Sequence, residues 1–136
     1  MSLAKEERKA IVDYRLEKCE NTFSDVIKAT EYGMYNTAAN RLYYSFYYVA
    51  SALLISNGIT AHTHSGLQSM IHLHFIKTGL LSVDDGVLMR RVFSLRQESD
   101  YDDFVILTAE DICPLLPKVR LLIDKLKSLI DIRVSP

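Results

Sequence analysis

Cysteine is scarce in this sequence: Cys19 and Cys113 are the only two, and they lie far apart without a Cys-x-x-Cys spacing. Isolated cysteines usually pack as small apolar side chains, so we expect two reduced thiols packed in helices, as in a cytoplasmic protein. The sequence also lacks a P-loop, a Gly-x-Gly-x-x-Gly loop and a Gly-x-Ser-x-Gly elbow. It therefore has no phosphate cradle or nucleophile motif of known form.

Histidine is equally sparse, with four residues in two His-x-His pairs, His62/His64 and His72/His74. On a helix, residues i and i+2 point about 200° apart, so the second pair cannot chelate one ion. The first pair lies in a predicted loop and has no third ligand at a recognisable spacing. We expect no metal site and no cofactor.

The sequence has neither an excess of one charge nor a long apolar run. Its formal net charge is −1, so any contact with RNA or DNA must come from a local patch. No uncharged apolar stretch is long enough for a transmembrane helix, and the first residues lack the apolar core of a signal peptide. We expect a cytoplasmic protein with no membrane contact.

The sequence does contain a helical pattern of apolar residues along its whole length. With 136 residues, of which 49% are hydrophobic and 24% charged, the chain can bury the core of one domain. We predict an all-α fold, a five-helix up-and-down bundle formed by a single domain over residues 4–132. The helices are expected over residues 4–32, 36–56, 65–78 and 83–99, with a last helix opened by residues 108–111.

Residues typical of helix ends mark these boundaries. Gly33, Gly58 and Gly79 follow the first three predicted helices and are expected to stop them. Asn36 and Ser82 are expected to cap the second and fourth helices at their N-termini.

The last helix has an irregular beginning. Thr108 and Asp111 resemble a capping box, and apolar residues then repeat at the 3-4 spacing of a bundle seam. Pro114 and Pro117 lie too far in to be simple first-turn prolines. We therefore expect a kink or a late start here.

The second predicted helix is apolar or aromatic on nearly all sides. Leu42, Phe46 and Leu53 lie on one face, while Arg41 and Tyr44 lie on the other side. A helix of this kind is usually buried on more than one face. It is either the central helix of the bundle or also contacts a partner subunit.

Arg96 lies near the end of the fourth predicted helix, followed by an acidic loop that begins at Asp100 and Tyr101. Its planar guanidinium is suited to binding a phosphate, with Tyr101 and the nearby acids beside it. The alternative is an ordinary helix-end arginine that pairs with Asp100, Asp102 or Asp103. On the residues alone, this ordinary pairing is favoured.

Three segments together resemble one known family. Residues 36–46, NTAANRLYYSF, resemble the second-helix signature of HEPN domains, in particular the small UPF0332-type branch. Residues 77–81, KTGLL, and 95–104, LRQESDYDDF, look like the same branch, and His64 precedes the third predicted helix in a familiar place. The likeness covers nearly the whole chain.

This resemblance implies a helical bundle that dimerises, with the helix-end arginine of each subunit facing a shared cleft. Many HEPN domains are metal-independent ribonucleases, or toxins held in check by a nucleotidyltransferase encoded beside them. Their signature is an arginine followed, after four to six residues, by a histidine. This sequence has Arg96 but no histidine after it, and Tyr101 stands where four intervening residues would place one. Tyrosine, with a pKa of about 10, transfers protons poorly near neutral pH.

From the resemblance we expect a dimeric nucleotide- or RNA-binding domain that acts with a minimal nucleotidyltransferase partner in a toxin–antitoxin or similar defence module. Arg96 would hold a phosphate, and the cleft around it would be formed by Asp100, Tyr101, His64, Arg41 and Tyr44.

Two alternatives remain open. The first is a metal-independent endoribonuclease with a non-standard site, whose catalytic residues would be Arg96 with His64 or Tyr101. The second is a catalytically inert interaction module, in which Arg96 is only a salt-bridged helix end.

Overall fold

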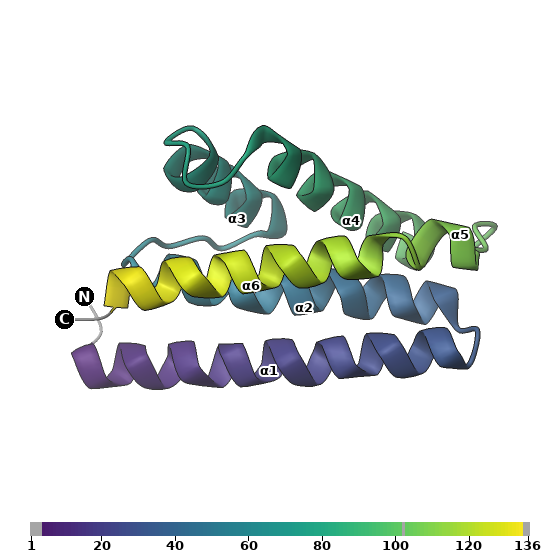
Figure 1. Cartoon of the computed structure of the whole chain (residues 1–136), viewed down its shortest axis with the longest axis horizontal. Helices are drawn as coiled ribbons and strands as arrows, with labels where there is room; N and C mark the ends of the chain where they lie inside the picture. Colours follow the sequence, from purple (N-terminus) through teal and green to yellow (C-terminus); the bar gives the residue numbers. More distant parts are fainter. Residues whose placement is uncertain (1–3, 102, 135–136) are drawn as a thin grey trace.

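The computed structural model describes residues 4–101 and 103–134, and within them every regular element is a helix. This confirms the predicted all-α class (Figure 1). In chain order the elements are α1 (Lys5–Glu31), α2 (Tyr35–Ser56), α3 (His64–Ile71), the π-helix η1 (His72–Ile76), α4 (Val83–Tyr101), α5 (Ala109–Ile112) and α6 (Leu115–Val134).

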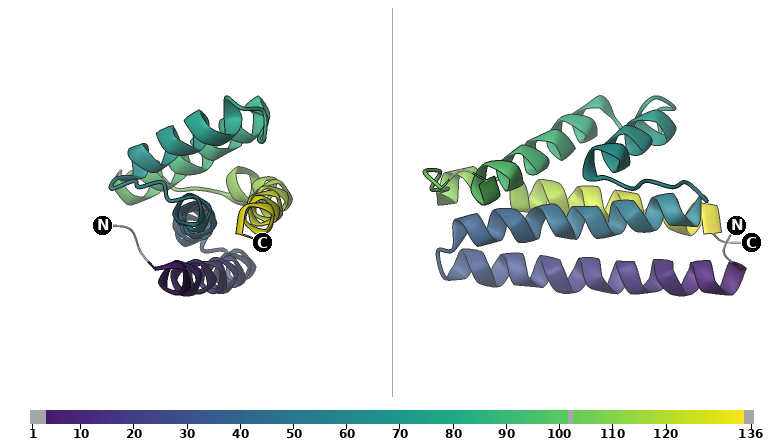
Figure 2. Two further views of the ribbon diagram at one scale, coloured as in Figure 1. Left: turned by 90° about the vertical axis from the view of Figure 1, so that its left-hand side faces the viewer. Right: turned by 180° about the vertical axis from the view of Figure 1, so that it is seen from behind.

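The helices form two layers. Helices α1, α2 and α6 run lengthwise beside one another, and α3 and α4 diverge obliquely above them (Figure 1). Seen from the end, α2 lies at the centre, with α1 below it, α6 at its side and the second layer above (Figure 2). Helix α2 contacts α1, α3, α4, α5 and α6. It is therefore the central helix, and packing within one chain accounts for its apolar character on nearly all sides.

The predicted apolar stripes form the core of the described residues. The α2 face is fully buried, and α1 contributes Val12, Cys19 and Val26 to the same core. The α6 seam is buried from Val119 onward, where its apolar side chains pack beside α2. The buried residues of the α2 face are Ala39, Leu42, Phe46, Val49, Ala50 and Leu53.

Most predicted helix ends are confirmed. Gly33, Gly58 and Gly79 have φ values of 70°, 70° and 84°, in the left-handed region where glycine meets no Cβ clash. Ser82 caps α4, since its Oγ accepts from the Asp85 amide at 3.0 Å while the Asp85 carboxylate accepts from the Ser82 amide at 2.8 Å.

The last predicted helix is broken as its prolines suggest. Thr108 and Asp111 form the predicted capping box at the start of α5, which ends at Ile112. Helix α6 begins at Leu115, directly after Pro114, and Pro117 lies in its first turn, where no intrahelical amide is needed. Cys113 lies at this break and is exposed, contrary to the expectation that it packs, because it lies beside the apolar seam that runs through the buried Ile112 and Val119.

Asn36 does not cap α2. The helix begins one residue earlier, at Tyr35, so Asn36 is already inside its first turn. Its side chain instead reaches the segment after α4, where Nδ2 donates to the Val105 carbonyl at 3.0 Å and Oδ1 accepts from the Leu107 amide at 2.8 Å. A cap predicted from local sequence is thus a long-range tether.

Two boundaries near the candidate site also differ from the prediction. Helix α3 begins at His64, one residue before the predicted start, and Thr63 caps it by accepting from the Gly66 amide at 2.9 Å. Helix α4 continues to Tyr101, so Asp100 and Tyr101 are helical residues and not part of a loop. The ion pair between Arg96 and Asp100 spans one turn and supports this extension.

Candidate functional site

Arg96 lies in the second-last turn of α4 and points towards α2. Its Nε donates to Asp100 Oδ2 at 2.9 Å, and its Nη2 donates to the hydroxyl of Tyr44 at 3.1 Å. The side chain is only 11% exposed. A nearly buried guanidinium needs such partners, because burying a charge without them is costly.

Three aromatic rings surround the Arg96 guanidinium. Its Cζ lies 5.5 Å from the ring centroid of Tyr43, 5.4 Å from that of Tyr44 and 5.5 Å from that of Tyr101. Each distance falls within the range of a cation–π interaction. Tyr43 is buried, whereas Tyr101 is 73% exposed, so the rings hold Arg96 between the core and the surface.

A chain of polar contacts joins Asp100 to Arg41. Asn40 Nδ2 donates to Asp100 Oδ2 at 3.0 Å, and Asn40 Oδ1 accepts from Nε and Nη2 of Arg41 at 3.0 and 2.7 Å. The Arg41 Cζ lies 5.2 Å from the ring centroid of Tyr44. Both arginines therefore contact Tyr44, from different helices.

His64, the first residue of α3, completes the arrangement. Its Nδ1 shares a hydrogen bond of 2.7 Å with the Tyr43 hydroxyl, and its ring packs against Tyr44 and Tyr47, with centroids 5.9 and 5.1 Å away. Burial, and then the charge of Arg96, lower the pKa of His64 below its ordinary value of 6.5. A lower pKa favours the neutral imidazole, which is the form that can accept a proton.

All six residues predicted for the site come together in this one place. Three others join them and were missed as site residues: Asn40, Tyr43 and Tyr47. Together with Tyr44 they occupy positions 40, 43, 44 and 47 of α2, the i, i+3, i+4, i+7 pattern of one helix face. We call the whole group the Arg96 cluster; it consists of Asn40, Arg41, Tyr43, Tyr44, Tyr47, His64, Arg96, Asp100 and Tyr101.

Arg96 makes the ion pair with Asp100 that an ordinary helix-end arginine would make. Asp102, another partner considered for it, lies outside the described residues, and Asp103 forms no ion pair with a described residue. The pairing leaves part of the guanidinium unused, since none of its hydrogen bonds to described residues involves Nη1. Guanidinium has five donors, so Arg96 can still donate to an oxyanion without losing Asp100.

The other candidates for chemistry lie elsewhere. His72 and His74 are exposed on η1, and no three potential metal ligands lie together in the part of the chain that is described. Burial raises the pKa of the Cys19 thiol to about 12, which makes it a poor nucleophile. Among the described helices, none is long and apolar enough to cross a membrane.

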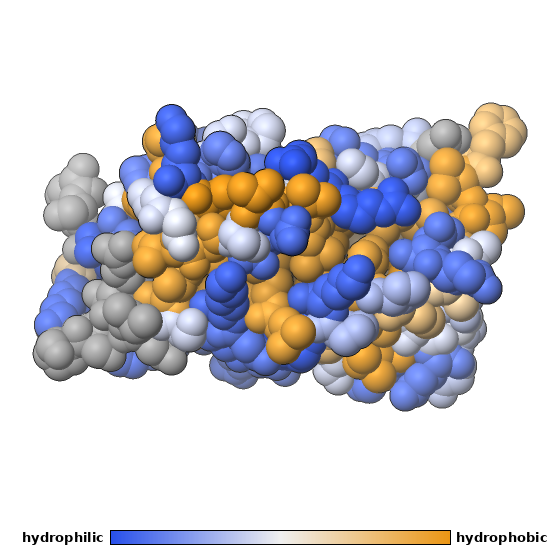
Figure 3. All heavy atoms as spheres, turned by 45° about the horizontal axis from the view of Figure 1, so that its top comes forward, coloured by the Kyte–Doolittle hydropathy of each residue, from blue (hydrophilic) through white to orange (hydrophobic). Residues whose placement is uncertain are grey.

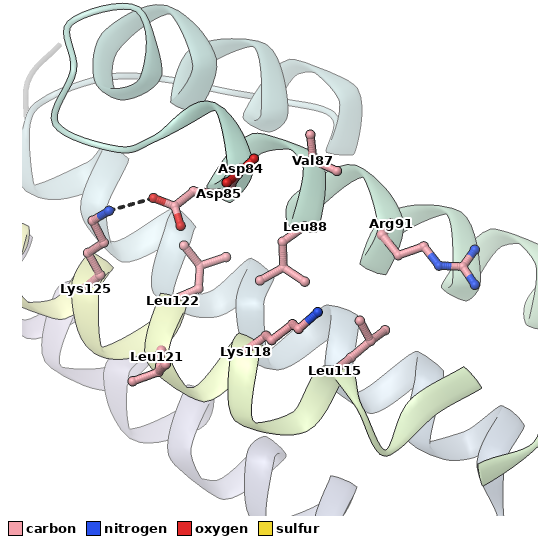
Figure 4. Close-up of a pocket in the computed structure, with 10 residues that line it drawn as sticks. All are labelled: Asp84, Asp85, Val87, Leu88, Arg91, Leu115, Lys118, Leu121, Leu122 and Lys125. Carbon is pink, nitrogen blue, oxygen red and sulfur yellow. Dashed lines mark hydrogen bonds and ion pairs between the residues drawn. The ribbon is translucent and has the colours of Figure 1, made fainter. Parts of the chain in front are cut away.

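A separate groove of about 650 Å³ lies between α4 and α6 (Figure 4). Its floor includes Leu88 and Leu122, and an ion pair of 2.7 Å between Lys125 and Asp85 closes one end. Figure 3 shows hydrophobic surface between hydrophilic residues on the face that carries α4 and α6. None of the lining residues belongs to the Arg96 cluster.

Comparison with known proteins gives consistent results. The HEPN domain family matches residues 12–129 of the chain. A UPF0332 protein of Thermotoga maritima is 27% identical over 92% of this chain and 95% of its own length. The Methanocaldococcus jannaschii protein named "Putative toxin MJ0142" is 31% identical over 82% of this chain and 76% of its own length. A UPF0332 protein of Archaeoglobus fulgidus is 28% identical over 88% of this chain and 95% of its own length.

Proposed function

The chain belongs to the HEPN domain family, and from this premise we propose that it is a nucleotide- or RNA-binding domain that uses the Arg96 cluster as its binding site. It acts as a dimer with a minimal nucleotidyltransferase partner, in a toxin–antitoxin or similar defence module. Similarity to proteins whose names describe toxins supports the toxin-like part of this proposal.

The observation that carries the proposal is the state of Arg96 itself. The guanidinium is held by Tyr44 and Asp100 and keeps unused donors on Nη1. A pre-oriented arginine loses little rotamer freedom when it binds a phosphate. The surrounding rings offer surfaces on which a base can stack.

A second candidate function, metal-independent cleavage of RNA, is favoured by the position of His64. The family signature places its histidine after the arginine, and this chain has none there. His64 instead comes from α3 and reaches the same tyrosines that contact Arg96. The lowering of its pKa favours the neutral imidazole, the form in which a general base acts.

One experiment tests both functions. The purified chain is mixed with cellular RNA in the presence of a chelator, and both RNA binding and cleavage are measured. Arg96→Ala should weaken binding about tenfold or more, since a hydrogen bond to a charged group contributes about 1.5–3 kcal/mol. Arg91→Ala, an exposed arginine of the same helix, is the matched control and should bind as the wild type does.

The outcomes separate the functions. Binding without cleavage supports the binding domain, and cleavage that is lost in both Arg96→Ala and His64→Ala supports the nuclease. If Arg96→Ala keeps its helical circular dichroism and binds RNA and partner as the wild type does, Arg96 is only a helix-end residue and the inert interaction module is correct.

A further inference from the structure

A continuous row of tyrosines and cations leads from the Arg96 cluster along α2 and onto α1. Tyr44 and Tyr48 are one turn apart on α2, with ring centroids separated by 6.1 Å, and Tyr47 contacts both. On α1, Arg15 Cζ and Lys18 Nζ lie 5.9 and 5.3 Å from the ring centroid of Tyr48. The row ends at Tyr14, whose centroid lies 5.6 Å from Lys18 Nζ. At the other end, Arg41 lies against Tyr44, and we call residues 14, 15, 18, 41, 44, 47 and 48 the tyrosine–cation row.

The charges of this row are largely uncompensated. Asp100 neutralises Arg96, but no described carboxylate forms an ion pair with Arg15, Lys18 or Arg41. These three cations are therefore available to pair with a phosphate, although the chain as a whole has a net charge of −1. The same residues leave rings accessible to solvent, since Tyr14 is 59% exposed and Tyr44, Tyr47 and Tyr48 are partly exposed.

The length of the row exceeds that of one nucleotide. From Arg41 to Tyr48, α2 advances by about 10 Å, and the row then crosses to α1. At about 3.4 Å per stacked nucleotide, this distance corresponds to about three nucleotides. Alternating rings and cations are the chemistry that binds single strands, because bases stack on the rings and phosphates lie against the cations.

We propose that the tyrosine–cation row is a binding track for single-stranded RNA that extends the Arg96 site towards α1. Phosphates lie against Arg15 and Lys18, and bases stack on Tyr48 and Tyr14. The track rests on the proposed function, because one end of the bound RNA strand occupies the Arg96 cluster.

The test compares RNA lengths on the full chain. Fluorescence anisotropy measures binding of labelled oligouridylates of two, four and eight nucleotides, and uridine monophosphate is measured as a competitor. Affinity should rise up to about four nucleotides and then change little. The variant Arg15→Gln/Lys18→Gln should lose this gain, while its affinity for the mononucleotide stays unchanged.

Salt dependence supplies a second readout. For single strands each neutralised phosphate contributes about 0.7 to the slope of log affinity against log salt, so the double variant should lower the slope by about 1.4. The matched control is Arg91→Gln/Lys118→Gln, which removes one arginine and one lysine from the groove between α4 and α6. It should leave both the length dependence and the slope unchanged.

Three results would overturn the track. The affinity of the wild type does not rise with RNA length, the double variant Arg15→Gln/Lys18→Gln keeps this rise in affinity, or the control Arg91→Gln/Lys118→Gln loses as much of it as the double variant does. In each case, mononucleotide binding that is abolished by Arg96→Ala would leave the proposed function standing. Absence of any binding to the wild type would instead refute the proposed function, and the track with it.

Discussion

Arg96 is oriented by contacts that come from two helices. Asp100 lies one turn away on α4, whereas Tyr43 and Tyr44 come from α2. Cation–π contacts contribute about 0.5–1 kcal/mol each at exposed sites and more when they are desolvated. Because these contacts act together, the guanidinium is held in one place before any ligand binds.

Glu20 of α1 binds two cations of α6 and so holds the two helices together. Its carboxylate accepts from Nη1 and Nη2 of Arg120, both at 2.8 Å, and also from Lys127. The hydrogen bonds from Arg120 lower the pKa of Glu20 from 4.5 to about 2, against the opposing effect of burial.

We predict that the ion pair of Glu20 with Arg120 makes the free energy of unfolding fall at acidic pH. The folded pKa is the lower one, so the unfolded chain binds the proton first, and the stabilisation present above about pH 4.5 is lost as pH falls to about 2. The carboxylate is 41% exposed and screened by solvent, so the contribution is about 1 kcal/mol or less. In urea unfolding at several pH values, Glu20→Gln should show a shallower loss of stability in acid than the wild type.

Glu17→Gln is the control for this measurement. Glu17 is exposed on the same helix and forms no ion pair with a described residue. Its replacement should leave the acid dependence as in the wild type. Identical curves for Glu20→Gln and the wild type would show that the ion pair does not stabilise the fold.

Among the helices, α2 holds the segment that follows α4, although the two are distant in sequence. Residues 103–108 connect α4 to α5, and Asn36 of α2 binds the backbone of this connection on both sides of Ile106. Ile106 itself is 84% exposed, so apolar packing of this residue does little to hold the connection. The two hydrogen bonds of Asn36, together with the buried side chain of Leu107, hold this connection in place.

We predict that Asn36→Ala destabilises the protein by roughly 1–3 kcal/mol, because the Leu107 amide and the Val105 carbonyl lose their partner. Urea unfolding followed by circular dichroism measures this change. Asn36→Asp keeps the acceptor for the Leu107 amide but loses the donor to the Val105 carbonyl. Its free energy of unfolding should therefore lie between those of Asn36→Ala and the wild type.

Asn21→Ala is the matched control, since Asn21 is exposed on α1. Its effect should stay within about 0.5 kcal/mol, as for most surface substitutions. An Asn36→Ala variant as stable as this control would mean that water replaces both hydrogen bonds at no cost.

In the whole molecule, the central position of α2 removes one reason to expect a partner subunit. The sequence left open whether its apolar surface packs inside one chain or against another subunit, and five other helices of the same chain contact it. The proposed dimer therefore rests on the family resemblance, which implies helix-end arginines that face a shared cleft, and not on unburied apolar residues of α2.

We predict that the chain is a dimer at roughly tens of micromolar. Light scattering coupled to size-exclusion chromatography should give twice the chain mass of 15.5 kDa. Arg91→Ala, already the control for binding, should give the same mass. A monomeric mass would refute the shared cleft but would leave the Arg96 cluster of each chain as a binding site.

Local sequence patterns predicted the helices, most of their ends and six residues that the structure brings together. Helical periodicity and glycine stops depend on residues a few positions apart, which a sequence displays directly. The site residues were recognisable because Arg96, Asp100 and Tyr101 are close in sequence and because residues 36–46 resemble a known signature.

The groups that surround Arg96 depend on how the helices pack in three dimensions. Tyr43 and His64 lie 21 positions apart and Tyr44 and Arg96 52 positions apart, yet each pair is hydrogen-bonded. Asn36 has the local sequence of a cap, but the segment after α4 supplies its partners. Such contacts depend on how α2, α3 and α4 pack against one another, and packing sums many weak interactions that no local pattern records.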